Sequence, residues 1–111
     1  MALHHAVPSE IVDVRPLGRK LHDGVSATLI KTRQIQVFRF ILKRDKVFAE
    51  HKVPGETTIQ CIEGAVEFKS PGGTQTLHAG ELVYLAAGDL HEMKGLVDSS
   101  VLVTIVACGP E

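Results

Sequence analysis

Three residues of this sequence carry the side chains that metal-dependent chemistry uses most often. His51, Glu56 and His91 together offer two imidazoles and one carboxylate. Such a set binds one divalent transition metal (iron, manganese, zinc or nickel) and leaves coordination positions open for a substrate. If the three side chains converge on one point, the sequence predicts an oxygenase, isomerase or lyase that acts on a small molecule.

Convergence requires neighbouring strands, and the chain has the pattern of a strand-rich protein. Short apolar runs with many β-branched residues alternate with turn residues such as Asp23-Gly24 and Pro71-Gly72. This pattern predicts an all-β sandwich or barrel. The expected strands are Glu10–Val14, Ser26–Thr32, Gln36–Leu42, Thr57–Ile62, Ala65–Lys69, Gln75–His78, Leu82–Leu85, His91–Lys94 and Ser99–Ala107.

Length and charge limit what the chain can be. Its 111 residues suffice for about one domain, which we divide into an N-terminal arm at 1–24, with an edge strand or a strand exchanged with a partner, and a barrel at 25–108. The formal net charge of -1 argues against a nucleic-acid partner. The sequence contains no apolar run typical of a signal peptide or a membrane span, so we expect a cytoplasmic protein without membrane contact.

The strand Gln36–Leu42 predicts the quaternary state. Phe38 and Phe40 alternate with Val37 and Arg39, so both faces of the strand are largely apolar. Such a strand in a small barrel needs cover on its outer side, and we expect a homodimer. Arg39 has two interpretations: a surface side chain that extends its charge to water, or a buried anchor for an anionic ligand.

Two segments narrow the choice among β folds. They are EHKVPGETTIQCIEG from Glu50 and GELVYLAAGDLH from Gly80. Both resemble the two signatures of the cupins. The positions that match are His51, Gly64, Gly80, Gly88 and His91. The resemblance implies a jelly-roll barrel, also called a double-stranded β-helix, with a pocket inside that holds a metal in many members.

The first segment departs from the cupin signature at two of its ligand positions. Val53 stands where the second histidine is expected, and the interval from Gly64 places the carboxylate at Thr57, whereas Glu56 comes one residue earlier. Neighbours in a strand face opposite ways, so only one of Glu56 and Thr57 can face the cavity.

This register leaves two alternatives open. If Thr57 faces the cavity, Cys61 shares its face and only His51 and His91 remain as ligands. If the Pro54-Gly55 turn contains a bulge, Glu56 turns inward together with Gln60 and completes the metal set.

Three functions follow from these alternatives. The first is a small-molecule ligand held in the barrel cavity, the second a metal-dependent enzyme built on His51, Glu56 and His91, and the third a non-catalytic dimeric module that contacts other proteins. A thiol in an apolar strand, as at Cys61, is also typical of an inert core residue. The candidate cavity residues are His51, Thr57, Gln60, Cys61, His91 and Arg39.

Overall fold

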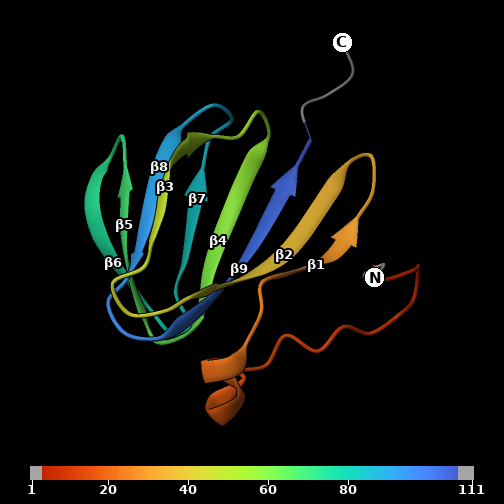
Figure 1. The fold of residues 1–111 in the computed structure, drawn as a ribbon. Helices are drawn as coiled ribbons and strands as arrows, with labels where there is room; N and C mark the ends of the chain where they lie inside the picture. Colours follow the sequence, from red (N-terminus) through yellow and green to blue (C-terminus); the bar gives the residue numbers. More distant parts are fainter. Residues whose placement is uncertain (1–3, 108–111) are drawn as a thin grey trace.

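Two antiparallel β-sheets face each other and form the barrel (Figure 1). The computed structural model describes residues 4–107, without the side chains of residues 50 and 51. One sheet has five strands in the order β1-β2-β9-β4-β7, and the other has four in the order β3-β8-β5-β6. The elements are η1 (Gly18–Asp23), β1 (Ala27–Lys31), β2 (Ile35–Leu42), β3 (Val47–Lys52), β4 (Glu56–Glu63), β5 (Ala65–Ser70), β6 (Gly73–His78), β7 (Leu82–Leu85), β8 (Leu90–Gly95) and β9 (Ser99–Val106). In this described stretch, no helix is long and apolar enough to cross a membrane.

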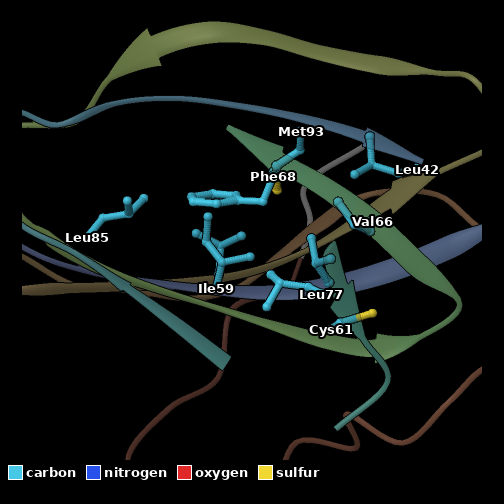
Figure 2. Close-up of a cluster of buried hydrophobic side chains, with 10 residues drawn as sticks. Leu42, Ile59, Cys61, Val66, Phe68, Leu77, Leu85 and Met93 are labelled. Carbon is cyan, nitrogen blue, oxygen red and sulfur yellow. The ribbon is translucent and has the colours of Figure 1, made fainter. Parts of the chain in front are cut away.

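The core lies between the two sheets, as the alternation of the strands requires. Along β4, buried positions alternate with more exposed ones from Glu56 to Cys61. Strands of both sheets contribute their inward side chains, and Phe68 of β5 lies against Ile59 of β4 in Figure 2. The buried cluster is Leu42, Ile59, Cys61, Val66, Phe68, Leu77, Leu85, Met93, Val101 and Val103. Alternation within each strand therefore decides which residues reach the barrel interior.

The predicted strands are present except for the first. Glu10–Val14 forms no strand, because it pairs with no other strand of the described chain and Ile11 is 94% exposed. One strand was not predicted: β3, whose apolar pattern is broken by Lys52 and by a bulge between Phe48 and His51. Cys108, the last residue of the predicted barrel range, lies outside the described residues. The all-β prediction is confirmed.

The N-terminal segment crosses to the outer face of the five-stranded sheet. The Ala6 N–H donates to the Leu29 carbonyl at 2.8 Å, which places the start of the arm beside β1. Further along, the Glu63 carboxylate accepts hydrogen bonds from the N–H groups of Leu17 and Gly18, at 2.9 and 3.1 Å. A guanidinium N–H of Arg39 donates to the Arg15 carbonyl at 2.9 Å. The chain thus covers part of this outer face itself.

Much of the rest of that outer face is uncovered, and exposed Glu56 stands on it opposite Val106. Two rows of cross-strand neighbours run over it, one from Val37 to Tyr84 and one from Leu102 to Leu82. We call the uncovered area the outer patch. It consists of Val37, Thr58, Gln60, Leu82, Tyr84, Leu102, Thr104 and Val106. Leu82 and Tyr84 are each 60% exposed, so the patch presents large side chains to solvent.

Candidate functional site

One hollow opens where the β1–β2 and β3–β4 turns meet the end of β9, and a second lies along β1 and β2. The first, the end hollow, has a volume of about 280 Å³ and the second, the side hollow, about 310 Å³. The end hollow is lined by Thr32, Arg33, Gln34, Ile35, Gln36, Val53, Pro54, Gly55, Ile105 and Ala107. The side hollow is lined by Ser26, Ala27, Thr28, Gln36, Phe38, Arg39 and Phe40. Gln36 of β2 lines both.

An aromatic cluster forms one wall of the side hollow. The Phe38 and Phe40 rings have centroids 4.8 Å apart and meet edge to face, and the Phe40 and Phe48 centroids are 4.7 Å apart. Phe38 and Phe40 follow Gln36 on β2 at intervals of two residues, which places the three side chains on one face of the strand. The hollow therefore combines apolar rings with one amide.

His91 is buried inside the barrel among aromatic rings. Its ring centroid lies 6.1 Å from that of Phe68 and 6.5 Å from that of Phe48, and both pairs are close to parallel. The side chain is only 3% exposed. In the ladder between β3 and β8, His51 is the residue directly opposite His91. The side chain of His51 lies outside the described residues.

The register of β4 places Thr57 inward and Glu56 outward. Thr57 is 2% exposed, and its hydroxyl donates to the carbonyl of Gly55, which lines the end hollow, at 3.2 Å. Glu56 is exposed and accepts a hydrogen bond from the hydroxyl of Tyr84, in the outer patch. The two residues therefore face opposite sides of the five-stranded sheet, as the alternation of a regular strand requires.

The remaining candidates divide between the core and the outer face. Cys61 is buried among core residues, its thiol lies 3.5 Å from the Glu63 carbonyl, and burial raises its pKa, so it is an unreactive thiol. Gln60 lies in the outer patch. Arg39 is buried, but its side chain is held under the N-terminal arm by the Arg15 carbonyl. Arg39 also lines the side hollow.

The donor atoms do not fit a metal centre of two histidines and one carboxylate. With Glu56 on the outer face, the inward positions of β4 are Thr57, Ile59 and Cys61. Among the residues whose side chains are described, no three of the His, Cys, Asp and Glu type gather as metal ligands. A stable site needs at least three protein ligands.

Gln36 is the site residue that the sequence interpretation missed. The signal was present, because Gln36 is the one polar residue on the strand face that carries Phe38 and Phe40. The end hollow depends on where the β3–β4 turn meets β9, and Gly55 shows how closely they meet. A Cβ at Gly55 would lie 1.7 Å from the carbonyl oxygen of Val106.

Neither a protein-family profile nor a curated protein sequence matches this chain. Several solved structures do. A conserved protein of unknown function from Streptococcus pyogenes matches with a TM-score of 0.78 and 19% identity, over 99% of this chain and 100% of its own. A cupin superfamily protein from Desulfitobacterium hafniense gives a TM-score of 0.73 at 15% identity, over 76% of this chain and 77% of its own. An RmlC-like cupin from Shewanella frigidimarina gives a TM-score of 0.71 at 11% identity, over 96% of this chain and 93% of its own.

These similarities establish the fold. The two facing antiparallel sheets match the cupin structures over three quarters of the chain or more. The cupin jelly roll expected from the segments that begin at Glu50 and Gly80 is therefore confirmed. The Streptococcus pyogenes protein, which also matches over nearly the whole chain, has no known function.

Proposed function

We propose that this cupin-fold barrel binds a small organic molecule with an apolar body and one or two hydrogen-bonding groups. The observation that carries the proposal is the pair of hollows, of about 280 and 310 Å³, that share Gln36. Known ligand pockets begin at about 300 Å³ and are mostly apolar with a few polar groups. The two hollows together fit a ligand of one ring and a short substituent.

The lining supports this class of ligand. Phe38 and Phe40 offer ring faces and edges for stacking against a planar apolar body. Gln36 carries both a donor and an acceptor, so it can orient a hydroxyl, an amide or a carboxyl group. Thr28 and Ser26 add hydroxyls at the side hollow. Selectivity would then come from shape and from a few hydrogen bonds.

Binding accounts for the site better than metal-dependent catalysis does. The alternative enzyme requires Glu56 beside His51 and His91, whereas Glu56 is bonded to Tyr84 on the outer face. Thr57, which takes the inward position, is neutral and already donates its proton to the Gly55 carbonyl. These side chains supply no general base and no third strong metal ligand on β4.

A thermal-shift titration tests the proposal. Benzyl alcohol, benzoate and glucose serve as probes of an apolar body, of an added charge and of a fully polar body. We expect stabilisation that grows with the concentration of the aromatic probes, approaching about 2.7 kcal/mol at 100 times the dissociation constant. Glucose should produce a much smaller shift in melting temperature, because its hydroxyl groups would lose water against an apolar wall without gaining hydrogen bonds.

A pair of matched variants locates the site. Gln36→Leu should weaken the binding of the aromatic probes at least tenfold. Gln75→Leu changes an amide on β6 that lines neither hollow, so it should leave the titration unchanged. The proposal fails if no probe shifts the melting temperature up to millimolar concentration and native mass spectrometry of the purified protein finds no bound small molecule.

Metal analysis separates binding from the enzyme alternative. We expect protein purified without a histidine tag, then incubated with iron, manganese, zinc or nickel and dialysed, to hold far less than one metal per chain. One equivalent of metal that is lost in the His91→Ala variant would overturn our proposal in favour of the metal-dependent enzyme. His78→Ala serves as the control, because His78 is exposed on β6 and bonded to Glu81.

A further inference from the structure

The charged residues that line the two hollows all carry the same sign. Among the described residues of the lining, Arg33 and Arg39 are charged, and no aspartate or glutamate is present. The carboxylate that is closest in sequence, Glu56, lies on the outer face of its sheet and accepts a hydrogen bond from Tyr84. A hollow whose charged groups are all cationic favours an anionic ligand.

A bulge in β1 brings a further cation to the same wall. The register between β1 and β2 shifts between Thr28 and Ile30, so that Lys31 stands directly opposite Gln36. Without the extra residue, the alternation of β1 would turn Lys31 to the outer face. Residues directly opposite on paired strands share a face, with Cβ atoms about 5 Å apart. Bulges often re-aim a side chain in this way beside a functional site.

The Lys31 and Arg33 side chains are available to a ligand. Both are exposed, because β1 is the edge strand of its sheet and Arg33 lies in the turn that follows it. Among the described side chains, the ion pairs involve other cations, namely His4, Arg15, Lys69 and His78. An anion bound beside Gln36 would therefore meet two positive groups without displacing a carboxylate of the protein.

The turn that carries Arg33 is held in place before any ligand arrives. The Thr32 hydroxyl accepts hydrogen bonds from the N–H groups of Gln34 and Ile35, at 3.1 and 3.0 Å. The Gln34 carbonyl accepts another from the Ala107 N–H, at 2.8 Å, which ties the turn to the end of β9. Figure 1 shows this turn at the same end of the barrel as the β3–β4 turn. Such a fixed turn lowers the entropy cost of binding.

We propose that the ligand of this barrel is a small aromatic carboxylate. Its ring packs against Phe38 and Phe40 in the side hollow, and its carboxylate lies beside Gln36, where the two hollows meet. There the planar guanidinium of Arg33 can donate to both carboxylate oxygens, while Lys31 supplies a second positive charge. The inference rests on the proposed function and adds to it the charge of the ligand.

Calorimetric titration with three probes that share one ring tests the charge. Benzoate, benzyl alcohol and benzylamine are negative, neutral and positive at pH 7. We expect a dissociation constant for benzoate about tenfold below that for benzyl alcohol, because hydrogen bonds to charged groups are stronger than neutral ones. Benzylamine should bind most weakly of the three. Added salt should weaken the binding of benzoate and leave that of benzyl alcohol unchanged, since exposed charges are screened.

Matched variants assign the preference to the two cations. Lys31→Met and Arg33→Gln should each weaken the binding of benzoate by about threefold to tenfold, with little effect on benzyl alcohol. The controls are Lys69→Met on β5 and Arg44→Gln in the β2–β3 turn, which make the same changes at exposed residues outside both hollows. Circular dichroism should show all four variants folded, because the substituted side chains are exposed.

The outcomes distinguish this inference from the proposed function. Equal affinity for benzoate and benzyl alcohol overturns the inference and leaves the binding of a small apolar molecule standing. A preference for benzoate that persists in both Lys31→Met and Arg33→Gln overturns the placement of the carboxylate beside these cations. If none of the three probes binds at millimolar concentration, the proposed function and the inference both fail.

Discussion

The outer faces of the two sheets differ in how they meet their surroundings. On the four-stranded sheet, Glu67 of β5 stands opposite Lys94 of β8, and Lys69 stands opposite Glu92, so opposite charges alternate over the face. On the five-stranded sheet, the central pair of Thr58 and Tyr84 is uncharged, and Glu56 stands opposite Val106 rather than opposite a cation. Water suffices to cover the first face. The second is covered in part by the N-terminal arm, which bonds to Glu63 and Arg39.

Two charged groups of the five-stranded sheet lie where the chain itself covers them. Glu63 and Arg39 both lie beneath the N-terminal arm and bond to its backbone. The hydroxyl of Ser100 also donates to Glu63, at 2.7 Å. Glu63 and Arg39 therefore hold the arm against this face, whereas the charges on the other face pair with one another in solvent. Four substitutions test this contrast.

The largest effect is expected at Gly64, the joint through which the chain passes from one sheet to the other. Its φ of 85° disfavours any side chain, and an added Cβ would lie 2.2 Å from the Ser99 hydroxyl and 2.6 Å from the Asp98 carbonyl. We expect Gly64→Val to lower the free energy of unfolding by about 3–4 kcal/mol, from backbone strain and overpacking together. Chemical denaturation measures this difference.

The control is Gly88→Val. Gly88 has a nearly equal φ of 84°, but a Cβ there meets no atom within 4 Å. Gly88→Val should therefore lower the free energy of unfolding only by the backbone strain, about 1–2 kcal/mol. If the two variants lose equal stability, the close contacts around Gly64 do not explain why a glycine is needed there.

The second effect concerns the bond that holds the arm to its sheet. Glu63→Ala removes the acceptor for Leu17, Gly18 and Ser100, and should lower the free energy of unfolding by about 2 kcal/mol. It should also expose the arm, so that trypsin cleaves there faster than in the wild type. An unchanged rate of cleavage would contradict the role of Glu63 in holding the arm.

The stabilisation by Glu63 should depend on pH. Burial alone would raise the pKa of this carboxyl, but the hydrogen bonds from the arm and Ser100, with the charge of Arg39, outweigh burial and hold the pKa below its ordinary value of 4.5. Because the folded pKa is the lower one, the stabilisation is complete above pH 4.5 and is lost as the pH falls through the folded pKa. Glu63→Gln should flatten that part of the stability profile.

Alternation of side chains made much of this architecture predictable. The residues of β2 and β4 that face the core follow from a period of two, and the choice between Glu56 and Thr57 follows from the same rule once the strand is known to be regular. The signature glycine at Gly64 also has a local cause, its positive φ. These features depend on few residues that are close in the sequence.

The features that the sequence did not reveal depend on distant contacts. Glu63 and Leu17 are 46 residues apart, and no local pattern signals that one accepts a hydrogen bond from the other. The bulge in β3 interrupts the alternation of side chains, which is the pattern by which the sequence would have predicted this strand. The end hollow beside Gln36 arises between turns whose approach is set by the whole fold.

The third effect is smaller because two terms oppose each other. Arg39→Met removes the hydrogen bond to the Arg15 carbonyl, which favours the arm. It also removes a buried charge whose Nε has no hydrogen-bond partner among residues 4–107, which relieves a cost. We expect a net loss of about 1 kcal/mol, with an upward shift of the Glu63 pKa because its positive neighbour is gone. Denaturation at pH 7 and pH 4 measures both.

The smallest effect should come from the matching change on the other sheet. Lys69→Met replaces an exposed cation whose nitrogen lies 3.8 Å from the Glu92 carboxylate, with the two side chains 54% and 31% exposed. An exposed pair at that distance contributes little, so the free energy of unfolding should change by less than about 0.5 kcal/mol. The same measurement therefore compares one substitution, cation to methionine, on both faces. If Lys69→Met costs as much as Arg39→Met, the charges of the four-stranded sheet also carry structure, and water alone does not account for its surface.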